Sequence, residues 1–191
     1  MKVYFSAPIK SIEEIEDSLK TMFNQITKLG HKHLDNYLQR LSEGMIFYEK
    51  MDKGGTKIRK DYFDQTVENI KAADAVVFEC TVPSLGIGFQ IEKALDYNKP
   101  TIVLYTKNHM PNFLAGTEND KLILKEYSAS NVVEVITDAL EEAKHTSDKR
   151  FNFFISPLLL TYLQEESEKS GMTKSAFIRK LILEYKKRSK K

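Results

Sequence analysis

Several features that would define other classes of protein are scarce or missing in this chain of 191 residues. A single cysteine, Cys80, excludes an internal disulfide, and its place at the end of an apolar run indicates a small buried side chain rather than a nucleophile. No run of about 18 apolar residues occurs, so we expect no membrane-spanning helix. The four histidines show no metal-ligand spacing, and we expect neither a metal nor a cofactor. The first residues enter a strand pattern without a signal peptide, which predicts a cytoplasmic protein.

The charges balance over the whole chain but not between its parts. The formal net charge is +2. Residues 147–191 carry 11 Lys and Arg against 5 Asp and Glu, whereas the preceding residues carry 18 against 22. A mildly acidic body with a basic tail suggests nucleic acid as a partner.

The stretch 73–105 gives the clearest structural pattern. It predicts a strand at 75–80, a loop of small residues at 81–88, a helix at 89–97 and a second strand at 101–105. This order is typical of a parallel βαβ unit, in which ligands bind at the carboxyl ends of the strands. A small-residue loop before a helix also presents backbone N–H groups and the positive end of the helix dipole to a phosphate.

The rest of the body continues the alternation of strands and helices. We expect a strand at 2–7, a helix from Ser11 to Gly30, a poorly patterned strand at 31–38, a loop or short helix at 41–55, a helix at 61–72, a strand at 122–127 and a helix at 130–143. The predicted fold class is α/β, with an open, mostly parallel, Rossmann- or flavodoxin-like sheet and helices on both faces.

Three segments of the body carry a family resemblance. They are KVYFSAPI at the first strand, DQTVENIKAAD with the following VVFEC strand, and TVPSLGIGFQIEKAL. Together they resemble the nucleoside 2-deoxyribosyltransferase family, and within it the deoxynucleoside 5′-monophosphate N-glycosidases. The resemblance implies a domain at 1–143 that binds a nucleotide or a nucleoside-like molecule.

The same resemblance implies two catalytic carboxylates that this chain lacks. The family places a nucleophilic glutamate two residues past the second glycine of the loop, and an assisting aspartate eight residues before the ADxVV aspartate. Gln90 and Thr66 occupy these positions, and an amide cannot act as the nucleophile. Glu92, Asp64 and Glu68 each lie two residues away, about 200° round a helix, and do not replace them.

The residues that would bind the ligand are retained. The family's nucleotide-facing first turn and phosphate loop correspond to Tyr4, Ser6, Ala7, Pro8, Ile9, Ser84, Gly86 and Gly88. Gln90 and Thr66 keep hydrogen-bonding groups, so a sugar could be held without being cleaved. Two alternatives remain open, namely an inherited scaffold without a ligand and catalysis by some other residue.

The tail predicts a second, smaller domain. Residues 144–149 have the composition of a linker. Residues 150–191 then give a short β run, RFNFFIS, a helix after Pro157, a turn at Gly171 and a helix opened by Thr173. This order resembles the ribbon-helix-helix DNA-binding family of small bacterial repressors. A unit of about 40 residues cannot bury an adequate core alone, so we expect two copies to pair.

The resemblance also suggests which tail residues would contact DNA. Alternation in RFNFFIS places Arg150, Asn152 and Phe154 on the outward face, where the family contacts base edges in the major groove. Phe154 departs from the usual polar residue there. Thr173, Lys174 and Ser175 match the family's phosphate contacts. The alternative is a dimerisation module that does not bind DNA.

The sequence therefore predicts a ligand-responsive, DNA-binding transcriptional regulator whose nucleotide-binding domain has lost its catalytic carboxylates. We expect a homodimer or a larger even-numbered homo-oligomer on a palindromic operator. The alternative is an active deoxyribosyltransferase or N-glycosidase whose tail only oligomerises it. A third hypothesis is an interaction protein with neither ligand nor DNA.

Overall fold

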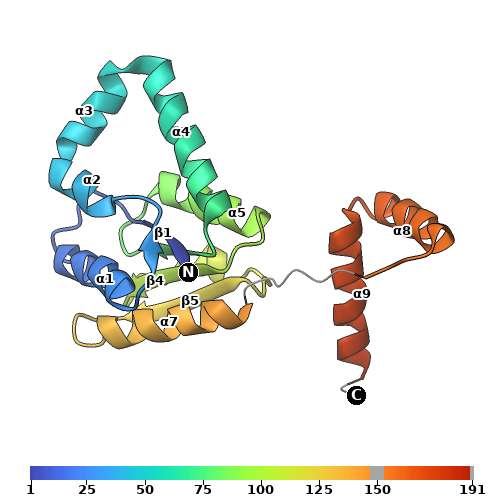
Figure 1. The fold of residues 1–191 in the computed structure, drawn as a ribbon. Helices are drawn as coiled ribbons and strands as arrows, with labels where there is room; N and C mark the ends of the chain where they lie inside the picture. Colours follow the sequence, from blue (N-terminus) through green and yellow to red (C-terminus); the bar gives the residue numbers. More distant parts are fainter. Residues whose placement is uncertain (147–152, 190–191) are drawn as a thin grey trace. The chain divides into compact units, whose positions relative to one another are not determined.

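The chain divides into two compact units, Met1–Asp148 and Lys149–Lys191 (Figure 1). The structure is a computed structural model that describes residues 1–146 and 153–189. No helix in these ranges is both long and apolar enough to cross a membrane.

A sheet of five parallel strands forms the centre of the first unit. The strands are β1 (Lys2–Ser6), β2 (Lys32–His33), β3 (Ala75–Glu79), β4 (Thr101–Thr106) and β5 (Leu122–Tyr127). Their order is β2-β1-β3-β4-β5, and every neighbouring pair is parallel. The order changes direction between β1 and β3, which is where open α/β sheets bind ligands. The predicted fold class is confirmed.

Helices cover both faces of this sheet. α1 (Glu16–Lys28) and α7 (Val132–Thr146) pack on the face that receives Val3 and Phe5. α4 (Gly55–Ala72) and α5 (Leu85–Asp96) pack on the other face, which receives Tyr4. Because both faces are covered, all five residues of β3 are buried, which explains why its first four, Ala75–Phe78, form a continuous apolar run.

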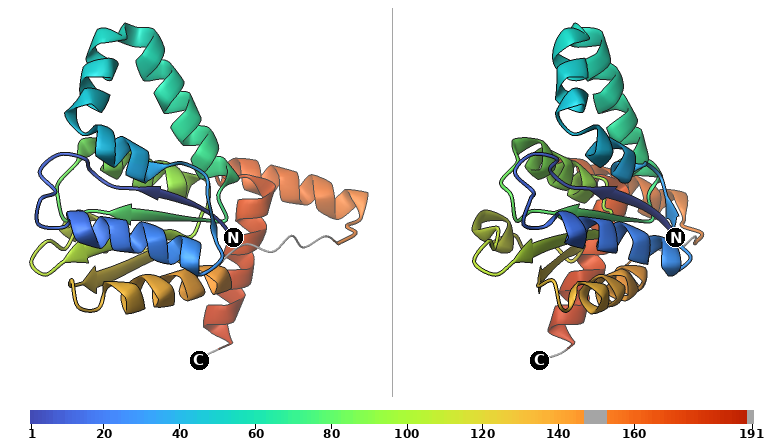
Figure 2. Two further views of the ribbon diagram at one scale, coloured as in Figure 1. Left: turned by 60° about the vertical axis from the view of Figure 1, so that its left-hand side comes forward. Right: turned by 90° about the vertical axis from the view of Figure 1, so that its left-hand side faces the viewer.

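A helical hairpin projects from the sheet between β2 and β3. α2 (Tyr37–Glu43) leads into α3 (Met45–Lys53), and α3 and α4 form the projecting arms (Figure 2). The sequence predicted a loop or a short helix at 41–55, and in the structure this segment is helical with breaks at Gly44 and Gly54. A Cβ at Gly54 would lie 2.2 Å from Ile58 Cδ1, so this turn needs glycine.

Several predicted boundaries differ from the structure. The helix expected from Ser11 begins at Glu16, because Ser11 has a φ of +57° and is not its N-cap. The strand expected at 31–38 is only Lys32–His33. A short helix, α6 (Asn112–Ala115), lies in the loop before β5. α5 begins at Leu85 rather than at 89, because the Ser84 Oγ accepts from the Ile87 N–H at 3.4 Å and caps it.

The second unit contains two helices joined by a tight turn. α8 (Pro157–Lys169) has Ser170 as its C-cap, and Gly171 follows with a φ of +64°. The Gly171 N–H donates to Glu168 O at 3.0 Å and the Met172 N–H donates to Ser167 O at 2.9 Å, which is the Schellman pattern. α9 (Lys174–Arg188) follows at once, capped by Thr173. The turn that the sequence predicted at Gly171 therefore forms as a helix C-cap.

The described part of the second unit has almost no core of its own. Among its described side chains only Ser167 is buried. Its large apolar side chains are more than a third exposed at Phe153, Phe154, Leu158, Leu159, Leu160, Tyr162, Met172, Leu181, Ile182, Leu183 and Tyr185. Residues 153–156, the described part of the predicted ribbon, are not in a strand. A strand needs a hydrogen-bonded neighbour, and one copy of this unit supplies none in its described residues.

Candidate functional site

The predicted ligand residues of the first unit gather at the point where the strand order reverses. Ser6 ends β1, and Ala7 and Pro8 follow it in buried positions, with Ile9 half-buried. Ser84, Gly86 and Gly88 follow β3 at the same end of the sheet, since the two strands are parallel neighbours. The topology therefore brings together two segments that are about 80 residues apart in the chain.

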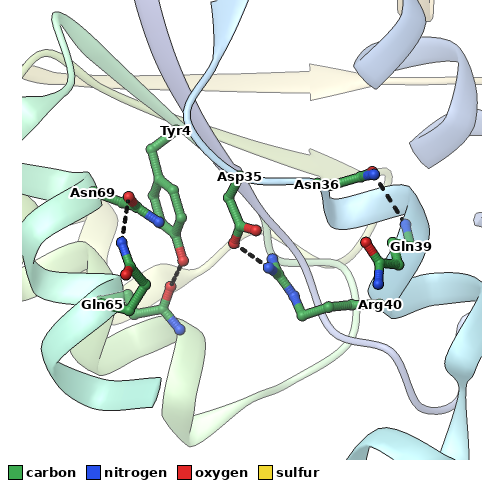
Figure 3. Close-up of polar contacts among 8 residues, drawn as sticks. Tyr4, Asp35, Asn36, Gln39, Arg40, Gln65 and Asn69 are labelled. Carbon is green, nitrogen blue, oxygen red and sulfur yellow. Dashed lines mark hydrogen bonds and ion pairs between the residues drawn. The ribbon is translucent and has the colours of Figure 1, made fainter. Parts of the chain in front are cut away.

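A hydrogen bond joins the first strand to Gln90, the position at which the family resemblance implies a nucleophile. The Tyr4 hydroxyl donates to Gln90 Oε1 at 3.0 Å, and Tyr4 is fully buried while Gln90 is half-buried (Figure 3). Burial is the main reason why the pKa of Tyr4 rises to about 12, so the phenol remains a donor at neutral pH. Because the amide oxygen of Gln90 accepts this hydrogen bond, its amide nitrogen can donate to a ligand beside Tyr4. Thr66, the second degenerate position, is buried on the neighbouring helix α4.

The N-terminus of α5 is open to an approaching ligand. Its first-turn N–H groups, at Leu85 and Gly86, have no acceptor within the helix. A Cβ at Gly88 would meet nothing within 4 Å, and one at Gly86 would meet only Ser84 Oγ at 3.9 Å. The glycines therefore leave space beside the donors rather than relieving strain. A cavity of about 660 Å³ adjoins this point, lined by Ser84 and Gly88 with mostly apolar residues of α5 and of the segment around α6.

An ion pair beside Tyr4 was not predicted. Asp35 lies in the loop before α2 and Arg40 lies within α2, and the Arg40 Nη1 contacts the Asp35 carboxylate. The side chain of Arg40 is only 12% exposed, and its Nη2 is buried without a hydrogen-bond partner in the described part of the chain. Burial opposes the charge of Arg40, but Asp35 outweighs it, so the pKa of Arg40 is raised and the guanidinium stays charged.

Aromatic side chains from the projecting hairpin stand near this pair. The ring of Phe47 packs edge-on against Tyr48 and Tyr62, with centroid distances of 5.4 and 5.3 Å. The Nζ of Lys10 lies 3.9 Å from the centroid of the Tyr48 ring. Tyr62 also influences the pKa values of both Tyr4 and Arg40, which places it close to the same region.

The buried carboxyl of Glu79 lies on the other side of the sheet from Gln90. Its Oε1 accepts from the Thr81 N–H at 2.9 Å and from the Tyr127 hydroxyl at 3.1 Å. Along β3, Glu79 follows Ala75 and Val77 on the face covered by α1 and α7, whereas Gln90 bonds to Tyr4 on the opposite face. Burial raises the pKa of Cys80 to about 12, so this thiol stays protonated at neutral pH.

The predicted DNA-contacting residues are only partly described. Arg150 and Asn152 lie outside the described residues. Phe154 is fully exposed, as is much of Phe153, so exposure does not distinguish the two faces of the predicted ribbon. The Thr173 Oγ1 accepts from the Ala176 N–H at 3.2 Å as the cap of α9, Lys174 contacts Gln164 Oε1, and Ser175 is exposed. Within residues 1–146 and 153–189, no cluster of three or more His, Cys, Asp or Glu could hold a metal ion.

Comparison with known proteins points to one class of relatives. The chain is 27% identical to a 5-hydroxymethyl-dUMP N-hydrolase of Tetraodon nigroviridis over 150 residues, which cover 75% of this chain and all of that protein. It is also 27% identical to a protein of Nematostella vectensis named for 2′-deoxynucleoside 5′-phosphate N-hydrolase activity, over 71% of this chain and 90% of the relative.

A solved structure shares the fold. The CMP N-glycosidase BcmB of Clostridium botulinum matches with a TM-score of 0.51 and 12% identity, over 72% of this chain and 99% of that one. No protein-family model matches the chain, so no family match supports the DNA-binding class expected for the tail. The homologues are thus nucleotide N-hydrolases, and they accord with the nucleotide resemblance seen in the body.

Proposed function

We propose that the first unit binds a deoxynucleoside 5′-monophosphate at the carboxyl ends of β1 and β3 and holds it without cleaving its glycosidic bond. The main support is the Tyr4–Gln90 hydrogen bond, because it holds an amide at the position where the family that this chain resembles has a carboxylate. In this arrangement the 5′-phosphate lies at the N-terminus of α5, near Ser84 and Gly86, and the sugar lies beside Gln90.

We further propose that the second unit pairs with another copy and binds DNA, which makes the chain a ligand-responsive regulator. The exposed apolar side chains of α8 and α9 support pairing, because a unit of this size with almost no core gains its stability from a partner. Its excess of Lys and Arg supports contact with phosphates. For a ligand to regulate DNA binding, it must bind the DNA-competent and DNA-incompetent states with different affinities.

The relatives favour a second candidate function, hydrolysis of a deoxynucleotide N-glycosidic bond. This reaction needs a carboxylate in the site. Asp35 is the carboxylate that the structure places beside Tyr4, although its Oδ2 is engaged by Arg40. Under this candidate Asp35 would act on the sugar or on a water molecule, and the second unit would only assemble the enzyme.

One pair of assays separates the two candidates. Calorimetric titration of the full-length protein with deoxynucleoside 5′-monophosphates measures binding, and chromatography of the same mixtures measures free base. We expect saturable binding and no free base. Release of base that is lost in Asp35→Asn would establish the hydrolase, and absence of any binding would contradict both candidates.

DNA binding is tested independently of the ligand. Selection from a random DNA pool at about physiological salt limits non-specific phosphate binding. We expect enrichment of a palindrome that is lost in Arg150→Ala/Asn152→Ala. If only salt-sensitive background binding appears, the second unit is an oligomerisation module.

A further inference from the structure

Arg40 is held in place more firmly than a surface arginine would be. Asn36 caps α2 by accepting from the Gln39 N–H at 3.2 Å. The next residue, Tyr37, is fully buried, and its hydroxyl donates to Pro8 O at 2.8 Å, which ties α2 to the loop that follows β1. Arg40 lies one turn further, with its Cζ 5.8 Å from the centroid of the Tyr37 ring. Asp35 then fixes one side of the guanidinium.

This anchoring leaves a buried donor that nothing in the described chain satisfies. Nη1 contacts Asp35, but Nη2 is buried and lacks a partner. A buried N–H without an acceptor costs free energy, more so when the group is charged. Figure 3 shows the side chains of Tyr4, Asp35 and Arg40 gathered in one region. Nη2 has almost no accessible surface in this structure, so the guanidinium must turn slightly for a ligand in the Tyr4–Gln90 region to supply the acceptor that removes this cost.

The proposed binding mode indicates which part of the ligand would meet Arg40. If the proposed function holds, the phosphate lies at the N-terminus of α5 and the sugar lies beside Gln90, one to two turns further along the same helix. Arg40 comes from a different element and interacts electrostatically with Tyr4, the partner of Gln90. The part of a nucleotide that extends beyond the sugar, away from the phosphate, is the base.

We propose that Arg40, positioned by Asp35, selects ligands whose base presents a carbonyl oxygen rather than an amino group at the edge it meets. The inference rests on the proposed nucleotide site and specifies its ligand. A guanidinium has five N–H donors and no acceptor. It can bond a carbonyl oxygen, but against an exocyclic amino group it leaves two donors facing each other. Oxo bases therefore satisfy Nη2, and the corresponding amino bases do not.

Two pairs of nucleotides differ in this group and little else. Deoxyinosine monophosphate carries a 6-oxo group where deoxyadenosine monophosphate carries a 6-amino group, and deoxyuridine and deoxycytidine monophosphates differ likewise at position 4. Since one good arginine–base pair discriminates by about 1–3 kcal/mol, we expect the wild-type protein to bind the oxo member of at least one pair about 10- to 100-fold more tightly. Where base is released, the ratio of kcat/KM replaces the ratio of Kd.

The variants test whether Arg40 is the cause. Arg40→Met should bring the ratio within each pair close to one, and deoxyribose 5-phosphate, which has no base, measures in the same variant how well the sugar-phosphate part of the site still binds. Arg59→Met is the matched control, because Arg59 is exposed and paired with Asp52 on the projecting hairpin. It should keep the discrimination. Asp35→Asn/Arg40→Met removes both charges, so that no carboxylate is stranded if the single variant folds poorly.

Each outcome decides the inference. The inference would be overturned if the wild-type protein bound the oxo and amino members equally, or if Arg40→Met kept the discrimination. In either case, binding of deoxyribose 5-phosphate would still support the proposed function. A loss of deoxyribose 5-phosphate affinity in Arg40→Met would show instead that Arg40 contacts the phosphate. If no nucleotide and no sugar phosphate bound, the proposed function and this inference would both be wrong.

Discussion

Restoring the carboxylate at position 90 tests whether the site is an intact N-glycosidase pocket without its nucleophile. In Gln90→Glu, a carboxylate oxygen replaces the amide oxygen that now accepts from Tyr4 at 3.0 Å. The phenol remains a donor because its pKa is raised to about 12. A charged acceptor makes a stronger hydrogen bond, and Gln90 is only half-buried, so desolvation of the new charge is limited. We expect the free energy of unfolding to change by no more than about 1 kcal/mol.

The expected gain in base release is the effect of restoring the nucleophile, reduced by the effect of the proton-transfer group that is still missing. Loss of the nucleophile in a covalent enzyme lowers kcat by roughly 10⁶. The variant still lacks a proton-transfer group at Thr66, a deficit of about 10²–10⁴. Gln90→Glu should therefore raise base release by at least about 10²-fold. Thr66→Asp should add a further factor, because burial at this position raises the pKa of a carboxyl and favours a proton donor.

The assay follows free base released from deoxynucleoside 5′-monophosphates under single-turnover conditions. Gln65→Glu is the matched control, since Gln65 lies exposed on α4 and bonds Asn69 rather than Tyr4. It adds the same charge and should release no base. If the folded Gln90→Glu/Thr66→Asp protein binds nucleotide but releases no base, the assignment of these two positions is wrong. An equal gain in Gln65→Glu would also contradict it.

Three further predictions concern stability and assembly. Gly88→Ala should stabilise the protein by about 0.5–1 kcal/mol, because Gly88 lies in a helix, and should weaken binding of the sugar phosphate, because the methyl enters open space at the N-terminus of α5. Gly171→Ala should destabilise the protein by about 1 kcal/mol, because its φ is +64°. Urea unfolding measures both changes in stability. Burial raises the pKa of Glu79, so the folded state favours the protonated carboxyl and loses stability as the pH rises above the ordinary value of 4.5. Glu79→Gln should therefore be more stable than wild type at pH 7, and the difference should shrink toward pH 4. A difference that stayed the same across this pH range would contradict the reasoning. Ile182→Lys, on the exposed face of α9, should reduce the oligomeric state in sedimentation analysis, and an unchanged mass would refute pairing through that helix.

Local signals in the sequence determined most of the fold of the first unit. The strands predicted at 75–80 and 101–105 form β3 (Ala75–Glu79) and β4 (Thr101–Thr106), because short apolar segments buried on both faces have few other stable conformations. Glycine at 30 and at 171 marked helix ends correctly, since both adopt a positive φ that other residues avoid. The family resemblance then indicated Tyr4 and Gln90, which the structure joins by a hydrogen bond.

Tertiary structure alone decided how the remaining groups meet. The Asp35–Arg40 pair was missed because the segment around it gave a poor strand pattern, and no local signal shows that α2 docks its Tyr37 beneath the loop after β1. Only the sheet placed Glu79 on the face opposite Gln90, a consequence of the alternation along β3. In the second unit the sequence supplied the helices and their caps, whereas the structure showed that the apolar side chains of its described residues remain largely exposed. Local chemistry thus sets the elements and their ends, whereas charge pairing and burial between distant segments depend on how the chain packs.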